Sequence, residues 1–270
     1  MQSKLICSDI DGTLLNKDRE LSDKTITVIK DISPTPFILI SSRMPKALTH
    51  LQEELAITNL PVIAYNGGLI LDQNKVLHST EIKHDVTENI FQFIKQTDLH
   101  LSLYHNDEWY VPSMDYWAKR ESNNTKVIPQ AQDIEITLKY WHSENKGAHK
   151  IMVMGDENEI DQLVSLIEKK FDDEIIGYRS KPTYLEISHR DISKKTAIEQ
   201  LLDQKYPELS INNVLAFGDN YNDIEMLKSV GLGVAVQNSK KEVLQAANQI
   251  TDSNIEDGVA NFIENIISKN

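Results

Sequence analysis

Two aspartates with one residue between them, Asp9 and Asp11, follow a short apolar run near the start of the chain. Residues 5–7 have the character of a buried strand, and Gly12 and Thr13 come directly after the second aspartate. An unpaired carboxylate in an apolar setting is very costly, so these side chains need a cation as partner. Oxygen-only ligands favour Mg²⁺. The alternative interpretation is a polar turn, because Asp and Gly are also frequent in turns.

Reactive polar residues recur at three later points, each beside an apolar segment. They are Ser41-Ser42-Arg43 after residues 37–40, Lys194 in the first turn of a helix that Ser193 can cap, and Asp219-Asn220-Tyr221-Asn222-Asp223 after residues 214–217. In a parallel sheet, groups at the carboxyl ends of the strands converge on one edge. Two carboxylates about 4 Å apart repel by about 4 kcal/mol at an effective dielectric of 20. A divalent cation and Lys194 would relieve this repulsion, and such a set is typical of phosphoryl transfer.

Each of these residues also has a simpler interpretation. Ser41 could cap a helix, and Lys194 could be a solvated first-turn residue, with Lys195 beside it as a competitor. The apolar positions of that helix favour Lys194 as the buried lysine. Arg43 and Asn66 could line the cleft or only bind main chain.

Alternating apolar runs and amphipathic helices predict the fold class, α/β with a doubly wound, Rossmann-like parallel sheet. Three apolar strands, at residues 5–7, 37–40 and 61–65, each end at polar or glycine-rich residues. A hairpin follows at residues 69–78. The same rhythm returns after residue 188, with a helix capped by Ser193, strands near 214–217 and 233–236, and a helix capped by Ser239.

Between these parts the pattern changes. We interpret residues 82–188 as an inserted α+β cap domain, and residues 1–81 and 189–270 as the core domain. One continuous domain with long excursions is the alternative. Within the insert the pattern predicts a helix over 86–94, strands at 99–104, 109–111 and 150–154, a helix over 160–167 and an antiparallel pair at 175–187; it assigns no element to 113–148.

Composition limits the partners. The chain carries 28 Lys and Arg against 41 Asp and Glu, a formal net charge of −13, which argues against nucleic acid and anionic membranes. The single cysteine, Cys7, allows no internal disulfide, and there is no signal region or membrane-spanning run. We therefore expect a cytoplasmic protein, monomer or homodimer. The histidines show no ligand spacing, so we expect no zinc site, with His142 and His149 on the surface of the insert.

These motifs resemble the four motifs of the haloacid dehalogenase superfamily. The matching residues are Asp9-Ile10-Asp11-Gly12-Thr13, Ser41, Lys194 and Gly218 to Asp223, and they span nearly the whole chain. The insert, Asn66-Gly67-Gly68 and the tail Glu256-Asp257-Gly258-Val259-Ala260 are similar to the Cof-type sugar-phosphatase branch, which has an α/β cap of type IIB. The chain departs from that branch at Ser41-Ser42-Arg43 (usually Thr-Gly-Arg), at Lys195 (usually Gly) and at Val236-Gln237-Asn238-Ser239 (usually near Met-Gly-Asn-Ala).

The resemblance implies a role for each matched residue. Asp9 would be a nucleophile that forms an aspartyl-phosphate, and Asp11 the general acid and base. Mg²⁺ would be held by Asp9, the main-chain carbonyl of Asp11 and Asp219, with Asp223 acting through water. Phosphate and substrate contacts would come from Ser41, Lys194, Gly12, Ser42, Arg43, Asn66, Gly67 and Asn222. The cap would close over the cleft and choose the substrate, with Tyr178, Arg179, Lys181 and Tyr184 as candidate contacts.

The expected function is therefore a Mg²⁺-dependent phosphatase of small phosphorylated metabolites, with sugar phosphates as the expected class. Two alternatives remain open. A phosphosugar mutase would yield isomerised phosphosugar instead of inorganic phosphate, and a phosphate- or Mg²⁺-binding protein on the same scaffold would show no turnover.

Overall fold

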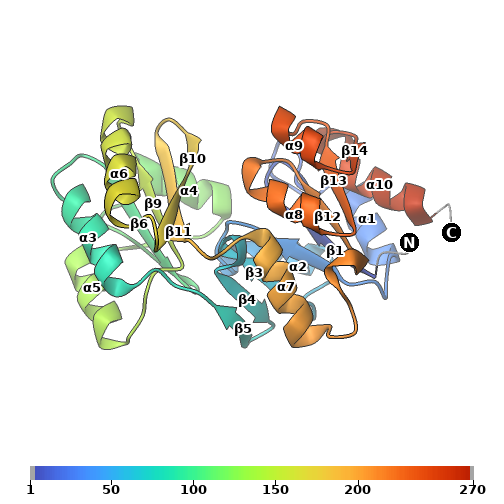
Figure 1. Ribbon diagram of the computed structural model, residues 1–270, viewed down its shortest axis with the longest axis horizontal. Helices are drawn as coiled ribbons and strands as arrows, with labels where there is room; N and C mark the ends of the chain where they lie inside the picture. Colours follow the sequence, from blue (N-terminus) through green and yellow to red (C-terminus); the bar gives the residue numbers. More distant parts are fainter. Residues whose placement is uncertain (1–3, 268–270) are drawn as a thin grey trace. The chain divides into compact units, whose positions relative to one another are not determined.

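The computed structural model describes residues 4–267, which pack as two compact units (Figure 1). One unit contains residues 4–78 and 193–267, and the other contains residues 79–192. The predicted fold class is confirmed, because a largely parallel sheet and a second sheet alternate with helices. We keep the domain boundaries at residues 82 and 188 as a proposal. Within the described residues, no helix combines the length and apolar character that crossing a bilayer requires.

The first unit is built on an eight-stranded sheet of order β14-β13-β12-β1-β2-β3-β4-β5. Its strands are β1 (Leu5–Ser8), β2 (Phe37–Ile40), β3 (Val62–Ala64), β4 (Leu69–Asp72), β5 (Lys75–Ser79), β12 (Val214–Gly218), β13 (Leu232–Val236) and β14 (Gln249–Thr251). Its helices are α1 (Asp23–Asp31), α2 (Lys46–Glu54), α7 (Lys194–Lys205), α8 (Ile224–Ser229), α9 (Lys241–Ala246) and α10 (Gly258–Ile267). The strands from β14 to β3 pair in parallel, and β4 runs antiparallel to β3.

The register of the central strands brings the motif residues to one edge. Ser8, the last residue of β1, lies opposite Phe217 of β12 and Leu39 of β2. Asp9 continues this ladder, because its backbone N–H donates to the carbonyl of Phe217 at 3.0 Å. The residues after these three strands therefore leave the sheet at neighbouring points, as predicted.

Apolar packing on both faces holds this sheet in place. On one face Ala197, Ile198 and Leu201 of α7 belong to the same buried cluster as Leu5, Cys7 and Ile38 of the strands. On the other face the ring of Phe217 packs edge-on against Phe262 of α10, with ring centroids 5.6 Å apart. Alternate residues of each strand are thus buried on opposite faces, which explains the continuous apolar runs in the sequence.

Two predicted helix caps have different outcomes. The hydroxyl of Ser193 accepts from Thr196 N–H at the start of α7, in a capping box, as predicted. The prediction that Ser239 caps the next helix is wrong, because α9 begins at Lys241 with Lys240 as N-cap. The Ser239 hydroxyl instead donates to the carbonyl of Val236 at 2.5 Å, so it satisfies the end of a strand.

The second unit has a six-stranded sheet of order β10-β11-β9-β6-β7-β8. Its strands are β6 (His100–His105), β7 (Glu108–Val111), β8 (Gln130–Ala131), β9 (Lys150–Met154), β10 (Ile175–Lys181) and β11 (Tyr184–His189), and its helices are α3 (His84–Ile94), α4 (Tyr116–Thr125), α5 (Ile134–Ser143) and α6 (Glu157–Lys170). Leu101, Leu103, Ile151, Val153, Leu185 and Ile187 point from one face of the sheet into a core shared with α3, α5 and α6. The predicted antiparallel pair of β10 and β11 is confirmed.

The segment 113–148, to which the sequence pattern assigned no element, contains α4, β8 and α5. Aspartates begin both helices: Asp115 accepts from Ala118 N–H at 2.8 Å, and Asp133 accepts from Glu135 N–H at 2.7 Å. Aspartate is among the best N-cap residues, so these caps were a usable signal in an otherwise polar stretch.

Candidate active site

A buried lysine joins two aspartates from distant parts of the first unit. Lys194 Nζ lies 2.5 Å from Asp9 Oδ1 and 2.6 Å from Asp223 Oδ1. The Lys194 side chain is fully buried, and so is that of Asp223. A buried charge is stable only when it is paired, and here the carboxyl ends of β1 and β12 provide the partners. Lys195, the competing residue, faces outward and pairs with Glu199 at 3.1 Å.

Asp223 also shapes the loop after β12. Its second oxygen, Oδ2, accepts from Asp219 N–H at 2.9 Å and from Asn220 N–H at 3.0 Å. One carboxylate thus binds Lys194 on one side and two backbone donors on the other. This arrangement fixes the position of Asp219 relative to Lys194.

Asp219 lies against the loop that follows β1. Thr13 donates from its hydroxyl to Asp219 Oδ1 at 3.0 Å. Gly12 has φ +88°, and a Cβ atom at this position would lie 2.5 Å from Asp219 Oδ2. Glycine is therefore required here both by the backbone conformation and by the close approach of the carboxylate.

Burial and mutual repulsion perturb the carboxylates of this cluster. Burial raises the pKa of Asp9 well above its usual range; Lys194 opposes this shift, while Asp223 and Asp219 add to it. Burial and the charge of Asp223 raise the pKa of Asp219 to about 6. For Lys194, burial lowers the pKa, but Asp223 and Asp9 more than offset this, so its pKa is raised and it stays charged. One lysine therefore does not fully neutralise three neighbouring carboxylates.

The chemistry of this donor set suits a small, hard divalent cation. Asp9, Asp219 and Asp223 each offer a carboxylate oxygen, and these oxygens lie within 4.8 Å of one another. All three donors are oxygen, the ligand type that Mg²⁺ prefers. A bound cation would also relieve the repulsion that raises the pKa values of Asp9 and Asp219. The residues present therefore fit the ion that the sequence predicts.

Asp11 has different partners, which the sequence did not reveal. Arg43 binds it through two hydrogen bonds, from Nε to Oδ2 at 2.7 Å and from Nη2 to Oδ1 at 2.6 Å. Arg19 Nη1 lies 3.5 Å from the same carboxylate. Burial acts to raise the pKa of Asp11, but the hydrogen bonds and charge of Arg43 outweigh it, so the pKa is lowered. Asp11 is thus held as a carboxylate in this state.

The other predicted phosphate contacts gather around the end of β2 and the turn after β3. Ser41 is buried, and its hydroxyl accepts from Arg43 N–H at 3.2 Å. Its carbonyl accepts from Asn66 N–H at 2.8 Å, and the Asn66 side chain accepts from Asn222 Nδ2 at 3.1 Å. Asn222 therefore connects the loop after β12 to this turn. Ser42 is half-buried; the ligand contacts expected of all these residues stay predictions.

Gly67 has a structural reason of its own. It has φ +114°, and a Cβ atom there would lie 2.7 Å from Ala197 Cβ and 2.8 Å from the carbonyl of Ser193. The turn after β3 thus packs directly on the first turn of α7, beside Lys194. Only glycine allows this approach.

Sequence reasoning missed Asn238 as a contributor to the site. Its Nδ2 donates to the carbonyl of Gly12 at 2.8 Å, and its Oδ1 accepts from Asn254 N–H at 2.9 Å. Asn254 in turn donates to the carbonyl of Leu15 at 2.7 Å. The loop after β1 is therefore tied to two loops near the carboxyl end of the chain. The only signal was the motif position of residues 236–239.

The four residues predicted to choose the substrate lie on β10 and β11 of the second unit. Arg179 forms an ion pair with Asp161 and also donates to the carbonyl of Pro182. Lys181 lies over the ring of Tyr184, 5.3 Å from its centroid. These contacts are ones that a purely structural role would also produce, so the substrate contacts of Tyr178, Arg179, Lys181 and Tyr184 stay a prediction.

The prediction that His142 and His149 lie on the surface is half right. His142 is exposed, but His149 is buried, with 2% of its surface accessible. It precedes β9 directly, and burial together with the nearby charge of His105 lowers its pKa to about 3. The mainly polar residues that precede His149 in the sequence did not indicate that its side chain is buried.

Comparison with known proteins finds similar proteins over nearly the full length of this chain. The family model described as haloacid dehalogenase-like hydrolase matches residues 6–263. A Haemophilus influenzae protein that is named as a phosphatase is 34% identical to this chain over 269 residues, and the match covers 98% of each chain. The Bacillus subtilis protein named 5-amino-6-(5-phospho-D-ribitylamino)uracil phosphatase YcsE is 30% identical and covers 96% of this chain and 94% of its own.

A solved structure has the same fold over nearly the whole chain. It is that of a haloacid dehalogenase-like hydrolase from Bacteroides thetaiotaomicron, with a TM-score of 0.89 and 27% sequence identity. The match covers 98% of this chain and 100% of the other.

Proposed function

Because this chain belongs to the haloacid dehalogenase-like hydrolases, and to their Cof-type phosphatases, we propose that it hydrolyses small phosphorylated metabolites with Mg²⁺ through an aspartyl-phosphate on Asp9. Membership makes the chain an enzyme, a phosphatase of this family. The identity of the ion, the substrate class and the covalent intermediate are the proposal.

One observation carries the proposal: Asp9 is bound by the buried ammonium group of Lys194, while Asp219 and Asp223 lie within a cation's reach of it. A carboxylate in this position is oriented by Lys194 and can face a phosphorus atom. A phosphate dianion can approach Asp9 only when the negative charge of the neighbouring carboxylates is neutralised. Lys194 supplies part of that positive charge.

The first step transfers the phosphoryl group to the protein. A carboxylate oxygen of Asp9 attacks phosphorus, and the bond from phosphorus to the ester oxygen breaks. Asp11, in its acid form, gives its proton to that oxygen, so the substrate leaves as an alcohol. Asp11 is held as a carboxylate by Arg43 in the present state, so Arg43 must loosen this contact when a phosphate ester binds.

The second step releases the phosphoryl group. Asp11, now a carboxylate, takes a proton from a water molecule whose oxygen attacks phosphorus. The bond between phosphorus and Asp9 breaks, which restores the Asp9 carboxylate and frees inorganic phosphate. Lys194 stays charged throughout and stabilises Asp9 in its ionised form.

Asp9, Asp219 and the main-chain carbonyl of Asp11 would hold Mg²⁺ directly, and Asp223 would contribute through a water molecule. When bound, the ion supplies positive charge beside the transferring phosphoryl group. Ser41 and Lys194 would bind phosphoryl oxygens, and Gly12, Ser42, Arg43, Asn66, Gly67 and Asn222 would complete the phosphate and substrate contacts.

Sugar phosphates and the phosphates of sugar alcohols are the proposed substrates. The relative from Bacillus subtilis is named for a phosphoribityl compound, which is the phosphate ester of a sugar alcohol. A formal net charge of −13 also favours a small substrate over an anionic polymer.

Release of inorganic phosphate from a panel of sugar phosphates, sugar-alcohol phosphates and nucleotides tests the proposal, with Mg²⁺ or with a chelator. We expect turnover that needs Mg²⁺, and a loss on the order of 10⁴-fold or more in Asp9→Asn. Asp31→Asn, an exposed aspartate of α1, serves as the control and should keep full activity.

The alternatives give different outcomes in the same assay. A phosphosugar mutase would convert one sugar phosphate into its isomer without releasing phosphate. A binding protein would show Mg²⁺- or phosphate-dependent stabilisation with no turnover of any substrate. Unchanged activity in Asp9→Asn would contradict the assignment of Asp9 as the nucleophile.

A further inference from the structure

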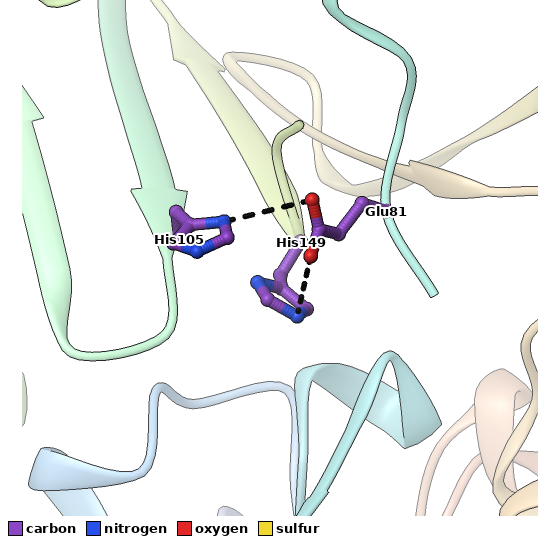
Figure 2. A group of neighbouring side chains, drawn as sticks. All are labelled: Glu81, His105 and His149. Carbon is purple, nitrogen blue, oxygen red and sulfur yellow. Dashed lines mark ion pairs between the residues drawn. The ribbon is translucent and has the colours of Figure 1, made fainter. Parts of the chain in front are cut away.

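Two histidines and a glutamate of the second unit lie together (Figure 2). Glu81 lies just before α3, His105 ends β6, and His149 directly precedes β9. His105 Nδ1 lies 3.7 Å from Glu81 Oε2, and His149 Nε2 lies 3.8 Å from Glu81 Oε1. The three donor atoms lie within 4.8 Å of one another.

We propose that Glu81, His105 and His149 form a binding site for a late first-row divalent cation of the Zn²⁺ class. Two imidazole nitrogens and one carboxylate oxygen are a donor set that suits Zn²⁺ and its neighbours Co²⁺ and Ni²⁺, and it disfavours Mg²⁺. This site is independent of the phosphatase reaction and of the ion proposed for it.

The spacing of the donors is close to what such an ion needs. Ligand atoms about 2.0–2.1 Å from a tetrahedral Zn²⁺ lie about 3.4 Å from each other. The distances of 3.7 and 3.8 Å run from the two different oxygens of Glu81, one to each histidine. One donor atom from each of the three residues lies within 4.8 Å of the other two, so no pair of donors has to approach by more than about 1.4 Å to bind a tetrahedral ion. Three protein ligands would leave a fourth position for water, or for the hydroxyl of Ser79, which lies 3.0 Å from His149 Nε2.

The backbone around the site holds the ligands in place. Gly147 N–H donates to Glu81 Oε2 at 2.7 Å, and the Gly147 carbonyl accepts from His105 Nδ1 at 2.9 Å. The neighbouring residues Ile82 and Ala148 exchange two backbone hydrogen bonds, of 2.7 and 3.0 Å. Glu81 and the segment that carries His149 are thus joined directly, by contacts that do not involve the donor nitrogens, so they lose little freedom when an ion binds.

Hydrogen bonds in the ion-free state set the affinity and provide a reporter. His149 Nδ1 accepts from Asn106 N–H at 3.1 Å, so its ring proton lies on Nε2. An ion that binds Nε2 requires the ring proton to move to Nδ1. The Nδ1 proton and the Asn106 N–H would then face one another as two donors, and their hydrogen bond would be lost. His105 Nδ1 must likewise give up its bond to Gly147. Binding therefore breaks existing hydrogen bonds, and we expect an affinity below that of closed structural zinc sites.

The test is a titration of the full chain, stripped of metal and then saturated with Mg²⁺ so that the carboxylate cluster is filled. Zn²⁺ binding is measured by calorimetry, and Co²⁺ binding by its visible absorption, which reports nitrogen ligands. We expect one ion per chain, with the dissociation constant raised at least roughly tenfold in Glu81→Gln and in His105→Gln. The Asn106 amide resonance should shift with Zn²⁺ in the unaltered protein.

A matched control is available in the same unit. The rings of His84 and His142 lie 4.7 Å apart, and His142→Gln removes a histidine from a pair outside the proposed site. This variant should bind Zn²⁺ as the unaltered protein does. Circular dichroism and melting without metal establish that each variant folds. Glu81 and His105 are used because both are only partly buried, whereas a change at buried His149 tests packing as well.

Either of two results would overturn the proposal. One is no saturable Zn²⁺ or Co²⁺ binding at millimolar ion. The other is binding that persists unchanged in both Glu81→Gln and His105→Gln, or that disappears in Asp219→Asn, which would place the ion at the carboxylate cluster. Neither result bears on phosphatase activity, which is measured separately.

Discussion

Lys194 Nζ lies 2.5 Å from Asp9 Oδ1, although 185 residues separate the two in the chain. The contact joins the first turn of α7 to the end of β1 and is buried. Neither charge would be tolerated there alone, so each residue explains the burial of the other. Asp223 completes the arrangement from the short 3-10 turn that follows β12.

Replacing Lys194 by Met should destabilise the metal-free protein by about 3–5 kcal/mol, because two buried carboxylates lose the lysine that pairs with both. Denaturant unfolding measures this. Lys195→Met, which removes a half-exposed partner of Glu199, should change stability by no more than about 0.5 kcal/mol. Equal stability of the two variants would contradict the buried ion pair.

Stability without metal should fall as the pH rises from about 5 to 7. The pKa of Asp219 is raised by burial to about 6 in the folded protein, against 3.8 for an ordinary Asp, so the folded state binds more protons over this range. The contribution is present below the ordinary value and is lost as the pH rises through the folded one. Asp9 acts in the same direction.

Mg²⁺ should therefore raise the melting temperature more at neutral pH than under acid conditions, because protons compete for the same oxygens. Scanning calorimetry with and without Mg²⁺ at each pH measures the difference. In Asp219→Asn both the pH dependence and the response to Mg²⁺ should shrink. An equal Mg²⁺ effect at both pH values would argue against ion binding by these carboxylates.

Arg43→Met should move both limbs of the kcat profile to higher pH, because Asp11 acts as an acid in the first step and as a base in the second. Burial alone raises the pKa of Asp11, and Arg43 is the main group that lowers it. Without the guanidinium group, Asp11 takes up a proton at higher pH and is no longer available as the base of the second step. Arg19→Met, which removes a contact of 3.5 Å from a half-exposed side chain, should shift both limbs less. The pH dependence of steady-state phosphate release distinguishes the two variants.

Gly12→Ala should weaken Mg²⁺ binding and activity together. The added Cβ would lie 2.5 Å from Asp219 Oδ2, at a residue with φ +88°, so either the loop or the carboxylate must move. We expect a loss of about 10²-fold in kcat/KM, since a displacement of about 1 Å has that effect. Gly231→Ala is the control outside the site, because a Cβ atom there would also clash, 2.0 Å from the carbonyl oxygen of Asn212. It tests whether a strained glycine substitution lowers activity by itself, and unfolding curves measure the loss of stability in each variant.

Local residue types carried much of the architecture. Short apolar runs such as residues 37–40, bounded by proline and polar residues, are typical of strands buried on both faces. Ser193 followed by Thr196 indicates a helix start. The aspartates after two of these strands fall on one edge because parallel neighbours are in register. The α/β fold, the family and the cluster of Asp9, Lys194, Asp219 and Asp223 were therefore accessible from the sequence alone.

Tertiary packing decided what depends on long-range contacts. Nothing local predicts that Arg43 binds Asp11 or that Asn238 binds the carbonyl of Gly12. The same is true of His149, which its neighbours in sequence would leave exposed and which is enclosed by segments more than forty residues away. Side-chain partners and burial depend on how elements that are distant in the sequence pack together, and a local sequence pattern does not specify which atoms will then be in contact.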